Sequence, residues 1–332
     1  MSSLVRSGRA ALLRLSRLPA PALTAVRWAL GIGIVVFLLA SFDARDVVSQ
    51  LRSTRLELAI PAIVGLVAIH LVGAATWRIL AARLSDQRLP WPTALWTYYV
   101  AQGLGGLTPG NLGADAYRVY AAPDGLAGWR RSLRPIVVQR VTSSAALAGL
   151  AVGAVAWLPA SIDTWFVVAG AAVVLAIGSS LLVLFLRRPR GAPSLQADEK
   201  PAAERRGLPG SILIGLVLGA AFHAGAIGLS FVLVTAVSPI ADPAPVLACL
   251  AIARLSILVP ISPSGLGFQE GALSLLFVRI GLPPETALAA ALLNRVALLA
   301  TVALGGLLLA LGAPRVASRR PPASERSSLP AS

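Results

Sequence analysis

Long apolar runs separated by short polar segments make up most of the chain. A helix needs roughly 20 apolar residues to cross about 30 Å of hydrocarbon. Six runs reach this length, and we predict that each forms a full membrane span. These runs are Ala22–Phe42, Leu58–Ala81, Pro135–Leu158, Thr164–Leu186, Ser211–Val237 and Thr286–Leu311. The pattern predicts an all-α polytopic membrane protein.

Two weaker apolar segments, Pro92–Leu107 and Pro245–Val259, are too short to span a bilayer. Each runs into a Gly- and Pro-rich break that is followed by another half-length segment, so we predict two re-entrant helical hairpins. Non-helical backbone at membrane depth is tolerated only where it is buried in protein or faces water. The predicted turn residues are Pro109, Gly110, Gly113, Pro260, Pro263, Gly265 and Gly267. The predicted fold has about six full spans and two hairpins, which together account for eight hydrophobic segments.

Arginine placement predicts the orientation of the chain. Basic residues concentrate in the N-terminus (1–21), the Pro-rich linker 187–210 and the Arg/Ser/Pro-rich tail (313–332), whereas 159–163 and 281–285 contain none. Because basic loops stay in the cytoplasm, we predict that both termini are cytoplasmic and that residues 22–312 form the membrane domain. The linker is predicted to be flexible and the tail disordered. The first run lacks a small-residue cleavage site, so we interpret it as an uncleaved span.

Uncommon residues recur in the same order in two halves of the chain. Repeat 1 covers about 58–158 and repeat 2 about 211–311, at an offset of 153 that becomes 155 after the break. The coinciding pairs are His70 with His223, Asp115 with Glu270, and Arg140 with Arg295. Acid and arginine are 25 residues apart in both halves. Since the first unit enters from outside and the second from inside, the pattern predicts an inverted repeat, the plan of many transporters.

Composition and charge fit a membrane protein and exclude several other classes. The chain is 56% hydrophobic and 13% charged, whereas a soluble domain has about a quarter of its residues charged. The net charge of +15 comes from arginines beside the apolar runs, which suits anionic lipid better than nucleic acid. One cysteine, Cys249, and two histidines are too few for a disulfide or a typical metal centre. We therefore expect neither a metal nor a cofactor.

The candidate site consists of charged residues in or beside the apolar segments. These are Asp115, Arg118, Arg140, Arg254, Glu270 and Arg295. Carboxylates at a helix start are stabilised by about 0.3–1 kcal/mol, which explains Asp115 without a ligand. Glu270, at membrane depth, is a functional candidate by default. Arg140 and Arg295 each need a carboxylate, a lipid phosphate or water, so structural ion pairs and ligand contacts both stay open. His70 and His223 are either hydrogen-bonded core residues or a proton or polar relay.

Four stretches resemble the membrane region of lysylphosphatidylglycerol synthases and its stand-alone relatives, over residues 22–312. They are LTPGNLGADAYRVY, RPIVVQRV, LVPISPSGLGFQEGALSLLF and LLNRVALL. The resemblance implies a flippase-like protein; in bifunctional members this region moves an aminoacylated phospholipid that a separate cytosolic domain makes. Only about 20 residues follow the last run, so translocation without synthesis is expected. The family often has two glycines before the aspartate, where this chain has Gly113 and Ala114.

The leading hypothesis is translocation of a phospholipid or polyisoprenyl-type lipid with an anionic head group across the cytoplasmic membrane. Two alternatives stay open: a secondary transporter of a soluble solute, and a non-transporting partner of a lipid- or glycan-synthesis enzyme. An enzyme is the least favoured class, because no nucleophile–base pair or metal set is visible. The sequence makes no prediction of the oligomeric state.

Overall fold

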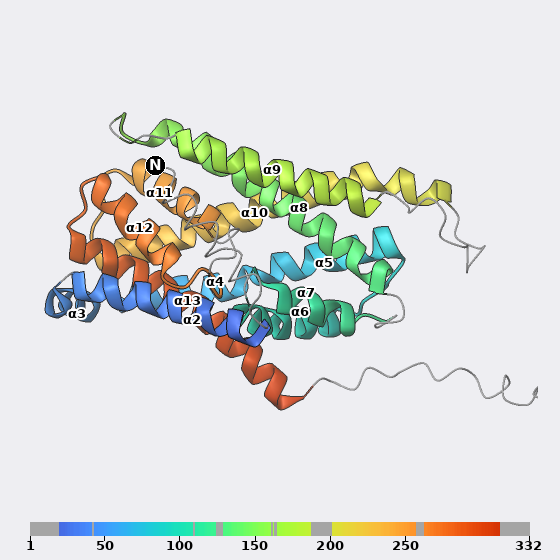
Figure 1. The fold of residues 1–332 in the computed structure, drawn as a ribbon, viewed down its shortest axis with the longest axis horizontal. Helices are drawn as coiled ribbons and strands as arrows, with labels where there is room; N and C mark the ends of the chain where they lie inside the picture. Colours follow the sequence, from blue (N-terminus) through green and yellow to red (C-terminus); the bar gives the residue numbers. More distant parts are fainter. Residues whose placement is uncertain are drawn as a thin grey trace, which may run out of the picture.

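Helices and short turns make up the described part of the chain, without a β-strand (Figure 1). The computed structural model describes residues 20–41, 43–108, 110–123, 129–160, 162, 165–186, 201–256 and 262–312. The helices are α2 (Ala20–Ser41), α3 (Ala44–Arg52), α4 (Leu56–Ala68), α5 (His70–Ser85), α6 (Trp91–Gly106), α7 (Leu112–Tyr120), α8 (Trp129–Ala154) with the 3₁₀ turn η1 (Val155–Trp157), α9 (Trp165–Leu186), α10 (Pro201–Val237), α11 (Pro243–Leu255), α12 (Phe268–Arg279) and α13 (Pro284–Leu311). The predicted turn residues Pro109 and Pro260, the disordered tail and most of the basic N-terminus lie outside the described residues.

Several helices are long and apolar enough to cross a membrane. Among the described residues there are four: Leu56–Ser85, Trp129–Trp157, Gly207–Val237 and Pro284–Leu311. A fifth arises if α2 and α3, which meet at an angle of 95°, form one broken span. These helices agree with the predicted multi-pass membrane protein, whereas the count of six full spans stays a prediction.

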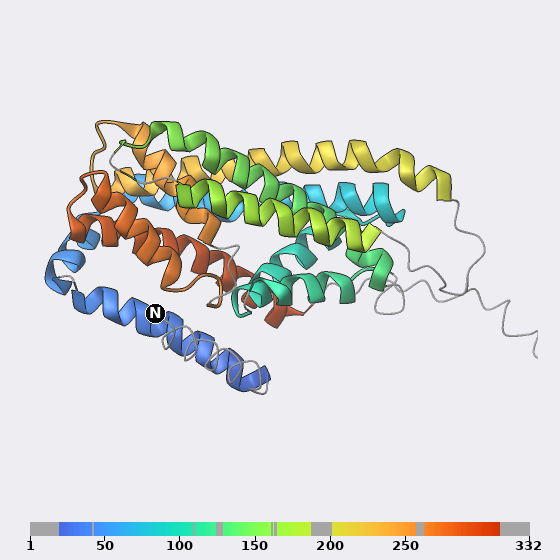
Figure 2. The ribbon, with the colours of Figure 1, turned by 45° about the horizontal axis from the view of Figure 1, so that its top comes forward.

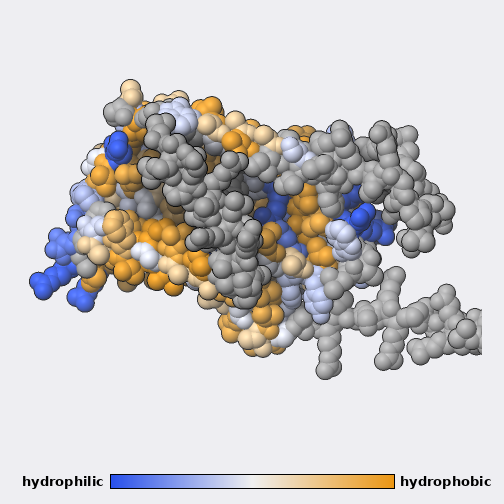
Figure 3. Space-filling view, in the orientation of Figure 1, coloured by the Kyte–Doolittle hydropathy of each residue, from blue (hydrophilic) through white to orange (hydrophobic). Residues whose placement is uncertain are grey.

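The surface of the helical bundle is apolar along the long helices. Ile60 and Val64 on α4, Leu213 and Val217 on α10, and Leu307 on α13 are all more than half exposed. Figure 3 shows hydrophobic residues over much of the visible surface, with hydrophilic residues gathered at its left end and again toward its right. Such a surface is a liability in water and is suited to hydrocarbon, where the helices satisfy their own backbone hydrogen bonds.

Three differences between the predicted and observed helices change a whole segment, whereas α8 only begins earlier, at Trp129 instead of Pro135. Helix α3 fills the polar loop after the first run, and the side chain of Asp43 caps it by accepting a 2.8 Å hydrogen bond from the backbone N of Arg45. The first span of repeat 1 is divided at Ile69 into α4 and α5. The Tyr99 hydroxyl donates to the carbonyl of Val67 at 2.9 Å and occupies an acceptor of the helix ladder just before this turn.

The third difference concerns the linker. Helix α10 begins at Pro201, so residues 201–210, which we predicted to belong to a flexible linker, are helical. Proline is tolerated in the first turn of a helix, and the Ala, Glu and Arg residues that follow have high helix propensity. The rest of the predicted linker, residues 187–200, lies outside the described residues.

Two pairs of short helices, α6–α7 and α11–α12, lie toward opposite ends of the molecule (Figures 1 and 2). The chain also runs in opposite directions along α4–α5 and along α10. Helix α6 packs on α13, and α11 packs on α8, so each pair of short helices contacts the last long helix of the other repeat. Because each pair of short helices packs against the other repeat, both Gly/Pro-rich breaks lie near the middle of the bundle.

Candidate functional site

The first break is a tight turn that presents Asp115. Gly110 and Asn111 adopt positive φ angles of 62° and 60°, and helix α7 begins directly after them. The Thr108 hydroxyl accepts a 2.8 Å hydrogen bond from the backbone N of Gly113, and a Cβ at Gly113 would approach that hydroxyl oxygen to 2.9 Å. These contacts favour glycine at 113, which lies with Asp115 in the first turn of α7.

The second break is built in the same way around Glu270. After Pro263, the residues Ser264, Gly265 and Gly267 have φ angles of 47°, 69° and 77°. Helix α12 then begins, and the backbone N of Gly267 donates a 2.7 Å hydrogen bond to Oε2 of Glu270. The carboxylate thus caps the start of its own helix, where the helix dipole favours negative charge.

Both acids form ion pairs with the arginines that lie 25 residues later in the sequence. Asp115 pairs with Arg140 on α8 and also with Arg118 on its own helix. Glu270 pairs with Arg295 on α13. The two sites differ in access, because the Arg140 side chain is 40% exposed whereas those of Arg295 and Glu270 are 7% and 3% exposed.

Each of these arginines also holds the turn of its own repeat. Nη2 of Arg140 donates to the carbonyls of Gly110 and Asn111, both at 3.0 Å. Nη1 of Arg295 donates to the carbonyl of Ser264 at 3.1 Å. In both halves one guanidinium joins the helix-starting acid to the positive-φ turn, so the same arrangement occurs twice with opposite orientation.

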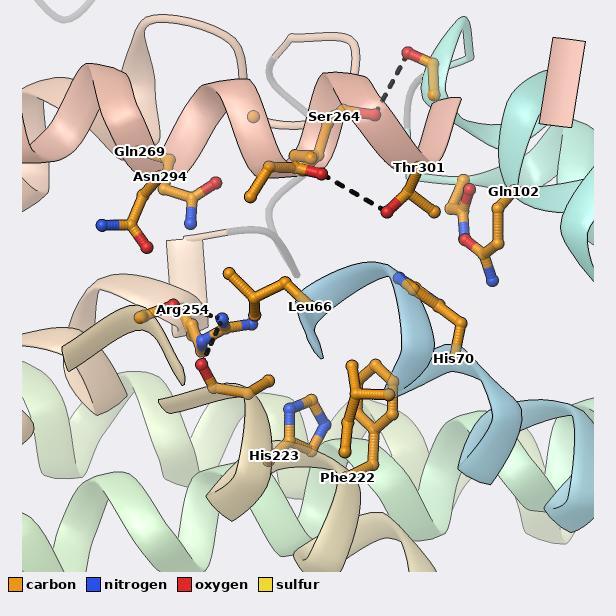
Figure 4. A pocket seen from close by; sticks show the side chains of 18 of the residues that line it. Leu66, His70, Gln102, Phe222, His223, Arg254, Ser264, Gln269, Asn294 and Thr301 are labelled. Atoms are coloured by element: carbon orange, nitrogen blue, oxygen red, sulfur yellow. Dashed lines mark hydrogen bonds between the residues drawn. The ribbon is translucent and has the colours of Figure 1, made fainter. Parts of the chain in front are cut away.

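A cavity of about 510 Å³ lies between the two breaks. Figure 4 shows side chains from α4–α5, α10, α11 and α13 pointing into it. Of the predicted site residues, those that line it are Arg118, Arg140, Arg254, Glu270, Arg295, His70 and His223. Asp115 is absent from the lining and lies behind Arg118 and Arg140. The Ser264 hydroxyl donates to the carbonyl of Gly106 at 3.1 Å and joins the two breaks across the cavity.

Arg254 differs from the other arginines of the cavity. Its Nη2 donates to the hydroxyl of Ser230 at 2.9 Å and to the carbonyl of Ala226 at 3.1 Å, and both partners are neutral. Among the described carboxylates, none forms an ion pair with Arg254. Figure 4 shows its guanidinium at the cavity, on the side that also carries His223.

The two repeat-related histidines meet in the same cavity. The Phe222 ring lies between them, with centroid distances of 5.4 Å to His70 and 5.1 Å to His223 (Figure 4). Nε2 of His223 lies 3.0 Å from the Ser143 hydroxyl. The Nδ1 atoms of both rings are buried and have no hydrogen-bond partner among the described residues.

Positive charge exceeds negative charge around the cavity. Four guanidinium groups line it, whereas Glu270 and the adjacent Asp115 are the carboxylates paired with them. Both carboxylates are already engaged by arginines. A low-dielectric cavity with this excess attracts an anionic group.

Several polar residues that line the cavity were not predicted from the sequence. Gln139 accepts from Arg118 at 2.9 Å and donates to the carbonyl of Gly73 at 2.8 Å. Its place directly before Arg140, matched by Asn294 before Arg295, is a signal that could have identified it. Ser230, Tyr98 and Gln102 also line the cavity, but nothing in their sequence context marks them.

Comparison with known proteins agrees with this structure. No curated protein matches the chain significantly. Residues 24–306 match the family described as lysylphosphatidylglycerol synthase TM region. The matched residues cover most of the helical domain and include both breaks and all the charged residues of the cavity. The chain therefore belongs to the lysylphosphatidylglycerol synthase TM region family.

Proposed function

We propose that the protein translocates a lipid with an anionic head group across the cytoplasmic membrane. The observation that carries this proposal is the excess of guanidinium groups in a cavity of about 510 Å³ inside a bundle with an apolar surface. The head group would cross through the cavity while the acyl or prenyl chain stays in the bilayer. The step changes no covalent bond, so the protein is not an enzyme in this proposal.

The proposed membrane arrangement has six full spans, two re-entrant hairpins and cytoplasmic termini. The short pairs α6–α7 and α11–α12, at opposite ends of the molecule, support it. The hairpins are related by the inverted repeat, so one opens toward the cytoplasm and the other outward. In this arrangement the half-exposed Arg140 belongs to the hairpin of repeat 1, and the buried Glu270–Arg295 pair belongs to the hairpin of repeat 2.

Replacing Arg140 with Gln tests the proposal. In vesicles that contain the purified protein and a fluorescent anionic phospholipid, we expect translocation to fall about tenfold, the effect of losing roughly 1.4 kcal/mol of head-group binding. The melting temperature should fall only modestly: the bonds to the carbonyls of Gly110 and Asn111 are lost, but the Arg140 side chain is 40% exposed and Asp115 keeps its pair with Arg118. A dithionite-quenching assay measures lipid movement.

Arg279→Gln is the matched control, since Arg279 is exposed at the end of α12 and away from the cavity. It should translocate lipid at the wild-type rate. Unchanged lipid movement in Arg140→Gln would remove the cavity from the transport path. Uptake of a soluble anion without lipid movement would favour the secondary transporter, and an intact cellular phenotype after neutralisation of both acids would favour the non-transporting partner.

Cysteine labelling tests the inverted topology. Arg88 and Ala241 are exposed and occupy matching repeat positions, 153 residues apart. In a Cys249→Ala background, we expect a membrane-impermeant maleimide to label Arg88→Cys only from the cytoplasm and Ala241→Cys only from outside. Cys249 itself is buried, so the parent protein should stay unlabelled. Labelling of both cysteines from the same side would contradict the inverted repeat.

A further inference from the structure

The charges at the cavity indicate which head group it accepts. Asp115 has an arginine at each carboxylate oxygen, whereas Oε1 of Glu270 pairs with Arg295 and Oε2 accepts from the backbone N of Gly267, so each carboxylate neutralises one guanidinium and has no oxygen left without a partner. Two positive charges therefore remain without compensation, and one of them is on Arg254, whose hydrogen-bond partners among the described residues are both neutral. An uncompensated charge in a low-dielectric site is costly unless a ligand or solvent neutralises it.

Several nitrogen atoms of residues that line the cavity also lack a hydrogen-bond partner in the described part of the chain. Nε of Arg118 and Nη2 of Arg295 are buried and have no partner among the described residues, although Arg118 and Arg295 are only 5% and 8% exposed. His70 and His223 line the same cavity, and their Nδ1 atoms also have no hydrogen-bond partner among the described residues. The guanidinium nitrogens among them can only donate hydrogen bonds, whereas each imidazole nitrogen donates or accepts according to its tautomer. A ligand with several acceptor oxygens satisfies this inventory.

The same inventory discriminates between lipid classes. An aminoacylated head group brings an ammonium group, which needs a carboxylate, and both carboxylates of the cavity are already occupied by arginines. A phosphodiester head group carries one negative charge and compensates half of the excess. A phosphomonoester carries about −1.5 to −2 charges at pH 7 and three acceptor oxygens. Guanidinium groups bind such oxygens in a planar, bidentate geometry.

We propose that the cavity selects a lipid that ends in a phosphomonoester or diphosphate group, and that Arg254, supported by Ser230, contacts this terminal phosphate. The inference rests on the proposed lipid translocation and narrows its substrate class. Lipids with an amino group on the head should be the poorest substrates, although the family takes its description from an aminoacyl lipid synthase.

Binding measurements test the selectivity separately from transport. The purified protein is titrated in mixed detergent micelles with phosphatidic acid, phosphatidylglycerol or an aminoacylated phosphatidylglycerol, and with inorganic phosphate, while thermal unfolding is followed. We expect phosphatidic acid to bind about tenfold more tightly than phosphatidylglycerol, which corresponds to roughly 1.4 kcal/mol. Equal or tighter binding of phosphatidylglycerol or of the aminoacylated lipid would overturn the inference.

Variants of Arg254 locate the contact. Arg254→Gln should lower the affinity for phosphatidic acid to that for phosphatidylglycerol, whereas Arg254→Lys should keep part of the preference and Arg279→Gln all of it. Without lipid, Arg254→Gln should unfold at or above the wild-type temperature, because no carboxylate loses a partner. An unchanged preference in Arg254→Gln would remove Arg254 from the site.

Translocation of the same lipids separates the inference from the proposed function. Movement of phosphatidic acid ahead of phosphatidylglycerol supports both. Equal movement of all the lipids keeps the proposed function and overturns the selectivity. Selective binding without movement keeps the selectivity and overturns translocation. Inorganic phosphate that binds as tightly as phosphatidic acid, and is taken up, identifies a soluble phosphate compound as the substrate and overturns the lipid assignment.

Discussion

Glu270→Gln is expected to destabilise the protein by about 3–5 kcal/mol, because breaking a buried ion pair leaves an uncompensated charge. The side chains of Glu270 and Arg295 are 3% and 7% exposed, so neither charge is solvated in the folded protein. Glutamine keeps an acceptor for the backbone N of Gly267, so the variant removes the charge while it preserves the helix cap. Thermal unfolding in detergent, followed by tryptophan fluorescence, measures the loss.

The double variant Glu270→Gln/Arg295→Met separates the ion pair from the shape of the site. A buried pair replaced by neutral groups of similar volume is often near neutral for stability, so we expect the double variant to recover most of the loss. Translocation should stay low, since the cavity has lost a guanidinium. A double variant less stable than Glu270→Gln would show that Arg295 stabilises the turn through its bond to Ser264 rather than through Glu270.

The matched ion pair in repeat 1 should respond less to the same change. Asp115→Asn leaves Arg140 unpaired, but its side chain is 40% exposed and its charge can be solvated. Arg118 keeps its hydrogen bond to Gln139 at 2.9 Å. The difference follows from sequence, because the position that corresponds to Arg118 in repeat 2 is Leu273. The two repeats therefore share a plan but form one accessible cluster and one closed pair.

The spacing of the charged residues made much of the site predictable from the sequence. An acid 25 residues before an arginine, in both halves, matches two ion pairs that the structure forms between a short helix and the next long one. Breaks rich in Gly and Pro were identifiable because left-handed turns favour glycine. Both features are local or periodic, and a sequence displays such features directly.

Other parts of the site depend on contacts between distant segments. The division between α4 and α5 coincides with a hydrogen bond from Tyr99, which lies 32 residues after Val67, and no residue near Ile69 marks it. Ser230, on α10, belongs to the candidate site only because its hydroxyl accepts a hydrogen bond from Arg254 on α11. Such roles arise from helix packing, which hydrophobic periodicity does not resolve.

The crossing of α6 and α13 is the point at which the smallest substitution should have the largest effect on packing. The helix backbones touch there: a Cβ at Gly305 would lie 2.2 Å from the carbonyl oxygen of Tyr99 and 2.6 Å from the backbone N of Gly103. Small residues permit such close approach between membrane helices, and backbone atoms cannot move aside as a flexible side chain can. Any side chain at 305 must therefore push the two helices apart.

Gly305→Ala is expected to cost at least the upper part of the ~1–3 kcal/mol typical of overpacked cores. Helix α6 leads into the first break and α13 carries Arg295, so separation of these helices should also weaken the bond between Ser264 and Gly106 and slow lipid movement. Melting temperature, the monodisperse fraction after gel filtration and lipid translocation should fall together.

Gly306→Ala is the matched control, because a Cβ there would meet nothing within 4 Å. Alanine also has a helix propensity about 1 kcal/mol better than that of glycine, so this variant should be as stable as the wild type or more so. Equal losses in both variants would mean that helix flexibility, rather than close packing, requires glycine at this crossing. A loss confined to Gly305→Ala would instead identify the backbone contact of α6 and α13 as the feature that holds the first break against the second repeat.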